Sequence, residues 1–144
     1  MTDRLSSGSD RLDAILGGGL PRNGIVLIGG NPGSGKTILA QQYVFHNASP
    51  DRPAIYLTTV SEPLEKVLRY GQSLEFFDPD ALGTSVIYED LGRTLNDEGL
   101  SGALASITEL LKQHRPGLVV IDSFRALQTY AADAETFRGF LHEL

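Results

Sequence analysis

Eight consecutive residues carry the clearest chemistry in this sequence: a glycine-rich stretch that ends in a lysine and a threonine. They read Gly30-Asn31-Pro32-Gly33-Ser34-Gly35-Lys36-Thr37 and fit the pattern G-x-x-x-x-G-K-[ST] at every fixed position. Glycines let successive backbone N–H groups point inward at phosphate oxygens, and a helix that follows presents its positive N-terminus to the same anion. The Lys36 ammonium would bridge the β- and γ-phosphates of a nucleotide, and the Thr37 hydroxyl would be a magnesium ligand. All eight residues are therefore predicted to bind ATP with Mg²⁺.

A carboxylate at the end of an apolar run is the second candidate for this site. Asp122 closes the run Leu118-Val119-Val120-Ile121 and is followed by Ser123. In a phosphate-loop fold, an acidic residue at the end of a neighbouring strand holds the magnesium, usually through water. The alternative is that Asp122 only caps the next turn. We predict that Asp122 is a metal-binding residue, together with Thr37.

Hydrolysis also needs a group that positions or deprotonates the attacking water. Glu62 is the only carboxylate at the end of the second expected strand, within Thr58-Thr59-Val60-Ser61-Glu62. A glutamate in the first turn of a helix is also favoured by the helix dipole, whatever its function. Lys36 and Glu62 are the catalytic candidates, and both readings of Glu62 stay open. Glu89-Asp90 follows the third expected strand and is either a carboxylate near the site or an ordinary turn, of which the turn is favoured. Arg125 lies just beyond Asp122 and either reaches phosphate or a partner or is a solvated arginine, of which the solvated arginine is favoured.

Strands alternate with helices around these motifs. Expected strands lie at Ile25–Ile28, Ala54–Thr59, Ser85–Tyr88 and Leu118–Ile121, because each is a short apolar or β-branched run. Expected helices run from Thr37 to about Asn47, from a Ser61 cap past Leu64, through Leu100–Leu111 up to Pro116-Gly117, and from Asp133 onward. This alternation predicts an α/β fold with a mainly parallel sheet covered on both faces, and ligands at the carboxyl ends of its strands.

The bulk properties are those of a single globular domain over residues 1–144. The chain has a formal net charge of −6, 41% hydrophobic residues and no cysteine, which excludes disulfides and thiolate metal sites. An acidic net charge argues against sequence-independent binding of nucleic acid, which requires a positive surface, although an acidic total can still include a small basic patch, so a nucleic-acid partner is not favoured. The start has no secretory signal pattern, and no apolar run is long enough for a membrane span. We expect a cytoplasmic protein.

Taken together, these stretches resemble the KaiC-like ATPases of the RecA superfamily. The resemblance is carried by Leu5-Ser6-Ser7-Gly8 with Asp10-Arg11-Leu12-Asp13, by Gly18-Gly19-Leu20-Pro21, by the phosphate loop, and by Val119-Val120-Ile121-Asp122-Ser123. It implies a three-layer RecA-like core, ATP as the nucleotide, and often a hexameric ring with ATP at the subunit interfaces. Relatives act in clock timing, signalling, recombination or unwinding.

The chain departs from this family in two respects. KaiC proteins carry two glutamates just after the second strand, where this sequence has Val60 and Ser61, and Glu62 comes one position late. The superfamily also inserts a further strand between the phosphate-loop strand and the magnesium-binding strand. Since this chain ends before that strand would come, we expect the N-terminal part of a longer domain.

Three functions follow from these patterns. The leading prediction is a KaiC-like ATPase with a regulatory or signalling role, working as a homo-oligomer. The first alternative is a nucleotide-dependent switch with little hydrolysis, which Val60 and Ser61 favour. The second is a recombination or helicase motor, against which the acidic charge argues.

Overall fold

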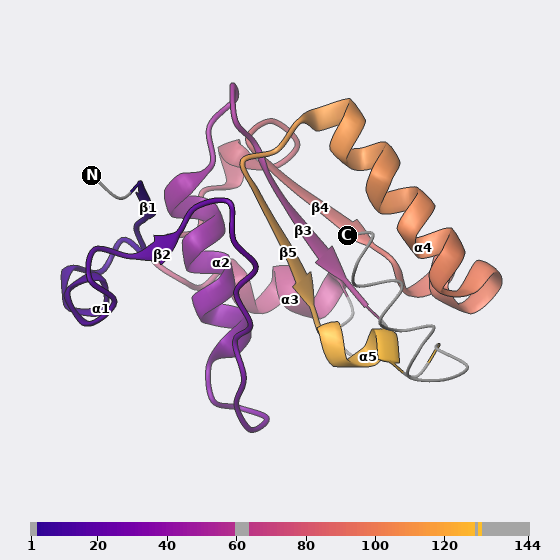
Figure 1. Ribbon diagram of the computed structural model, residues 1–144, viewed down its shortest axis with the longest axis horizontal. Helices are drawn as coiled ribbons and strands as arrows, with labels where there is room; N and C mark the ends of the chain where they lie inside the picture. The colour runs from indigo at the N-terminus through magenta and orange to yellow at the C-terminus, as the bar shows by residue number, and fades with distance from the viewer. Residues whose placement is uncertain (1–2, 60–63, 129, 131–144) are drawn as a thin grey trace.

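The computed structural model of the protein describes residues 3–59, 64–128 and 130 (Figure 1). Its strands are β1 (Arg4–Leu5), β2 (Leu20–Pro21), β3 (Ala54–Thr58), β4 (Val86–Asp90) and β5 (Leu118–Asp122). Its helices are α1 (Asp10–Ile15), α2 (Lys36–Asn47), α3 (Leu64–Gly71), α4 (Gly92–His114) and α5 (Phe124–Gln128), with a short 3₁₀ helix at Pro79–Ala81. The expected helix cap at Ser61 and the expected helix from Asp133 lie outside the described residues.

The central sheet consists of three parallel strands in the order β4-β3-β5. Strand β3 pairs on both sides, and all five of its residues are buried because helices cover both faces of the sheet at this strand. The register places Thr58, at the end of β3, opposite Asp90 on one side and Asp122 on the other. The carboxyl ends of the three strands therefore meet at one edge, as the sequence predicts for a parallel sheet.

Alternation along β3 sends its side chains to two separate hydrophobic layers. Ala54 and Tyr56 pack with residues of α2 and α3, whereas Ile55 and Leu57 pack with residues of α4. Figure 1 shows α4 on the side of the sheet opposite α2. The molecule is thus a three-layer α/β structure, which confirms the predicted fold class.

Helix α4 is longer than the pattern Leu100–Leu111 predicts, because it begins directly after β4. Asp90 is the last residue of β4, and its carboxylate accepts a hydrogen bond from the Gly92 N–H at 2.8 Å. The expected turn at Glu89-Asp90 is therefore wrong: both residues belong to the strand, and Asp90 ties the strand to the start of the helix. Within α4, Gly99 has a φ of 69° and kinks the helix.

A small N-terminal unit of β1, α1 and β2 contacts α2, the helix that follows the phosphate loop. Asp13 accepts hydrogen bonds from the Ser6 hydroxyl at 2.5 Å and the Ser7 hydroxyl at 2.7 Å. These hydrogen bonds lower the pKa of Asp13, and the bond from Ser6 has the largest effect. From α2, the side chains of Gln42 and Asn47 donate to the carbonyls of Ser7 and Ser6. Helix α2 is thereby fixed on the side away from the sheet.

The apolar run Ile25–Ile28 is not a buried strand, which corrects the prediction from its composition. It belongs to neither sheet, and Ile25 and Leu27 are 94% and 81% exposed. An apolar run is buried only where a neighbour covers it. The resemblance places another strand between this run and β5, and no such strand lies among the described residues, so the run has nothing to pair with.

Within the described residues, no helix combines the length and the apolar character needed to cross a bilayer.

Two leucine truncations test the layer assignment. Leu57→Ala removes a side chain that is 1% exposed in the α4 layer and should lower the free energy of unfolding by about 2–5 kcal/mol. Leu27→Ala, the same chemical change at an exposed position, should change it by less than about 0.5 kcal/mol. Urea denaturation of both variants measures the difference. Equal losses would mean that Leu27 is packed in a core and that Ile25–Ile28 is a strand after all.

Candidate functional site

The phosphate loop leads directly into α2 at the carboxyl edge of the sheet. Gly33 and Gly35 have φ angles of 81° and 95°, a region that favours glycine. Gly35 is also the N-cap of α2, so the cap residue brings no side chain to the first N–H groups of the helix. The loop is exposed to solvent. These free N–H groups and the positive end of the helix dipole suit an anion such as a phosphate.

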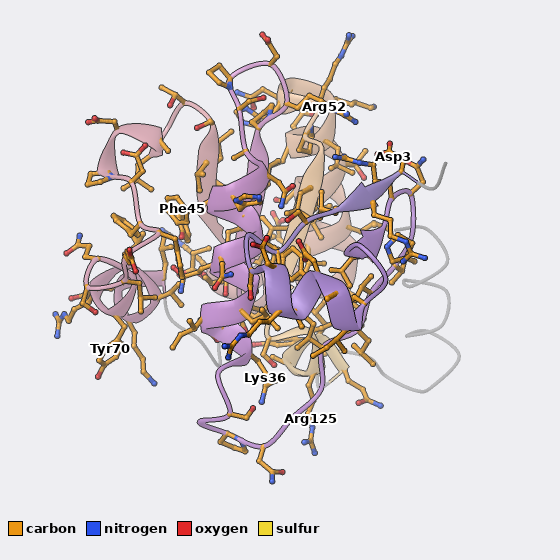
Figure 2. The ribbon with its side chains drawn as sticks, turned by 90° about the vertical axis from the view of Figure 1, so that its left-hand side faces the viewer. Asp3, Lys36, Phe45, Arg52, Tyr70 and Arg125 are labelled. Atoms are coloured by element: carbon orange, nitrogen blue, oxygen red, sulfur yellow. The ribbon has the colours of Figure 1, made fainter. Side chains whose placement is uncertain are left out.

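The Lys36 side chain is hydrogen-bonded to the backbone of this loop. Its ammonium donates hydrogen bonds to the carbonyls of Gly30 at 2.5 Å and Asn31 at 3.0 Å. The lysine charge is therefore held within the loop. Figure 2 shows Lys36 and Arg125 at the same end of the molecule, with Arg125 on α5 just beyond β5.

Asp122 is the residue that joins the loop to the sheet. The Thr37 hydroxyl, in the first turn of α2, donates to Asp122 Oδ2 at 2.7 Å. The Tyr56 hydroxyl, from the neighbouring strand β3, donates to the same oxygen at 2.5 Å. The two residues predicted from separate motifs as magnesium ligands thus meet directly, although they are 85 positions apart in sequence.

The oxygen groups gathered here fit Mg²⁺, which prefers carboxylate, hydroxyl and phosphate oxygens. Beside Asp122 in the register lies Thr58, whose buried Oγ1 has no hydrogen-bond partner within the described residues. A hydroxyl without a partner at a buried position is costly unless water or a ligand satisfies it. Thr37, Asp122 and Thr58 therefore form an oxygen-rich corner next to the phosphate loop.

Glu62 lies outside the described residues, as do Val60 and Ser61, so the catalytic role of Glu62 stays a prediction. The structure brings together Lys36, Thr37 and Asp122 at the edge where the sequence places the site.

Tyr56 is the site residue that the sequence reasoning missed, because it counted this tyrosine only as a β-former. Burial raises the pKa of Tyr56 far above its ordinary value, and the hydrogen bond to the Asp122 carboxylate raises it further. Its hydroxyl is therefore a permanent donor to Asp122. Strand alternation was the available signal, since Tyr56 lies two residues before the end of β3 and so faces α2.

Comparison with known proteins decides the family. The profile of a family described as ATPase: KaiC matches residues 5–144, nearly the whole chain. The chain belongs to the KaiC ATPase family. As a KaiC-like domain it is a member of the RecA superfamily, whose ATPases bind ATP.

The individual relatives carry different names. Over 65 residues the chain is 40% identical to a UPF0273 protein of Thermotoga maritima, covering 45% of this chain and 27% of that protein. It is 31% identical over 126 residues to the DNA repair protein RadA of Pseudomonas aeruginosa, covering 88% of this chain and 24% of RadA. It is 26% identical over 141 residues to the circadian clock protein KaiC3 of Synechocystis, covering 96% of this chain and 27% of KaiC3. The chain spans about a quarter of the length of these relatives.

A matched pair of glycine substitutions tests the geometry of the loop. Gly35→Ala and Gly83→Ala both place a side chain at positive φ, 95° and 81°, with no atom within 4 Å of the added carbon. Each should cost about 1–2 kcal/mol of backbone strain. Because Gly35 and not Gly83 lies in the predicted phosphate loop, only Gly35→Ala should weaken ATP binding, by about tenfold. Titration with a fluorescent ATP analogue measures this, and equal affinities in the two variants would contradict it.

Proposed function

We propose that this chain binds Mg-ATP at Gly30–Thr37 and hydrolyses it in a regulatory or signalling role. The observation that carries the proposal is the hydrogen bond between Thr37 and Asp122 at 2.7 Å. It joins the first turn of α2, directly after the phosphate loop, to the carboxylate at the end of β5. A hydroxyl and a carboxylate in direct contact beside the loop are oxygen groups of the kind that Mg²⁺ prefers, which supports the proposal.

The residues of the chain would act mainly by positioning and by charge. Backbone N–H groups of the loop and of the first turn of α2 would bind the phosphate oxygens. Lys36 would stabilise the charge that develops on the γ-phosphate during attack by water. A magnesium ion held by Thr37 and Asp122 supplies further charge neutralisation when bound. Glu62, or a group from outside this chain, would orient the attacking water.

A nucleotide-dependent switch with little hydrolysis is the second candidate. It is favoured by Val60 and Ser61, which stand where the KaiC-like pattern has its glutamate pair. Such a protein would bind ATP at the same loop but turn it over slowly, and would use the bound state for interaction.

A DNA-dependent motor is the third candidate. The RadA relatives of Pseudomonas aeruginosa and Brucella abortus, which cover 88% and 91% of this chain, support it. The net charge of −6 argues against it, because binding to phosphate backbones needs a positive surface.

We further propose that the protein works in the cytoplasm as a homo-oligomer, with a ring of six subunits as the expected form. The family assignment supports this, since KaiC-like proteins are oligomeric. Native mass spectrometry with and without Mg-ATP would determine the number of subunits.

A lysine substitution is the first test of hydrolysis. Lys36→Ala should lower the rate of phosphate release from Mg-ATP at least about 100-fold, because it removes the charge that stabilises the γ-phosphate. Lys112→Ala is the control, since Lys112 is exposed near the end of α4, where the chain turns to the start of β5. Equal rates in Lys36→Ala and wild type would refute the assigned site. Stimulation of the wild type by single-stranded DNA would favour the motor.

A glutamate substitution separates the ATPase from the switch. If Glu62 orients the attacking water, Glu62→Gln should lower the turnover rate by about 100-fold or more with ATP affinity unchanged. Glu65→Gln is the control, because Glu65 is exposed and, among the residues that the structure describes, forms an ion pair with Arg69 at 3.0 Å. An unchanged, low rate in Glu62→Gln would support the switch.

A further inference from the structure

We propose that Tyr56 is a positioning residue that holds Asp122 in the orientation needed to bind Mg²⁺ together with ATP. This inference rests on the proposed function and names a residue that the sequence motifs do not include. It starts from one carboxylate oxygen, Asp122 Oδ2, which accepts from Thr37 at 2.7 Å and from Tyr56 at 2.5 Å.

The sheet register explains why this tyrosine reaches Asp122. Tyr56 pairs with Val120 in the parallel ladder between β3 and β5. Asp122 lies two residues beyond Val120 and therefore on the same face of β5. That face is covered by α2, where Tyr56 and Val120 belong to one hydrophobic cluster. The hydroxyl of Tyr56 thus points along the sheet toward its carboxyl edge.

Packing makes the Tyr56 side chain a rigid support. It is 0% exposed, and its ring lies 5.2 Å from the ring of Tyr88 on β4, centroid to centroid. A buried tyrosine has few rotamers available, and its hydroxyl needs a partner because an unsatisfied buried donor is costly. Asp122 is that partner. The carboxylate is consequently held between a buried strand on one side and the start of α2 on the other.

This arrangement orients the Thr37 hydroxyl so that its oxygen lone pairs can bind a cation. A hydroxyl has one proton to donate and two lone pairs to offer. Since Thr37 donates its proton to Asp122, its lone pairs stay available for a metal. Asp122 can keep accepting from Thr37 only while its carboxylate stays in place, and the Tyr56 hydroxyl holds it there. Removing that hydroxyl should therefore weaken metal binding, although Tyr56 itself does not touch the metal.

The test compares two tyrosines that differ in one partner. Tyr56→Phe removes the donor to Asp122, whereas Tyr88→Phe removes a hydroxyl that donates to Gln41 Oε1 at 3.0 Å. For each variant, binding of a fluorescent ATP analogue is titrated with Mg²⁺ and also measured in excess EDTA. Tyr56→Phe should raise the half-saturating Mg²⁺ concentration about tenfold and leave metal-free binding within about twofold of wild type. Tyr88→Phe should change neither.

A double-mutant comparison shows whether Tyr56 acts through Asp122. Asp122→Asn should raise the half-saturating Mg²⁺ concentration on its own, and adding Tyr56→Phe should raise it no further. Additive effects would overturn the inference, as would equal shifts in Tyr56→Phe and Tyr88→Phe. Unchanged Mg²⁺ dependence in Tyr56→Phe, with Mg²⁺-dependent binding intact in wild type, would overturn the role of Tyr56 alone. Absence of ATP binding in wild type would overturn the proposed function and this inference with it.

A measurement on the wild type covers the case in which Tyr56→Phe does not fold. With ¹³C-labelled tyrosine, the ring carbon that bears the Tyr56 hydroxyl should shift when Mg²⁺ is added to the nucleotide complex. The same addition to Asp122→Asn should give no shift. If the chemical shift of this Tyr56 carbon did not change on addition of Mg²⁺ to the wild type, the inference would be overturned.

Discussion

The carboxylate of Asp122 connects the first turn of the phosphate-loop helix to the carboxyl edge of the sheet. Two hydroxyl groups donate to its Oδ2, one from the first turn of α2 and one from the middle of β3. The parallel register of β3 and β5 makes this contact possible, because it brings the ends of both strands to the same edge and turns Tyr56 and Asp122 toward α2. The loop itself is exposed and built from glycines, so its position depends on what holds the start of α2.

The rest of the structure holds the elements that carry this contact. Strand β3 is buried on both faces and paired on both sides, so it forms the centre of the sheet. On one face, α4 covers it; on the other, α2 packs against Ala54 and Tyr56. The N-terminal unit contacts α2 from outside through Gln42 and Asn47. The phosphate loop is thus an exposed segment whose following helix is supported from two directions.

Membership of the KaiC family agrees with the fold described above, but it does not select one function from those of its relatives. Relatives with names as different as a clock protein and a DNA repair protein align with most of the same chain. Residues 60–62, where Val60 and Ser61 stand in place of the glutamate pair of the KaiC-like pattern, are where this sequence departs from the family. Function here is decided by a few residues on a common fold.

The sequence by itself predicted the phosphate-loop pattern, helices α2 and α3, the second half of α4 and the three paired strands, but not α1 or α5. Positions 54–58, 86–90 and 118–122 lie within two residues of their predicted bounds, because local composition and turn residues specify such elements. Only the tertiary structure decided that Ile25–Ile28 is exposed, because burial depends on a neighbour and not on the run itself. It also decided that Tyr56 donates to Asp122 beside Thr37, since a contact between residues 66 positions apart follows from strand order and register, which no local pattern contains.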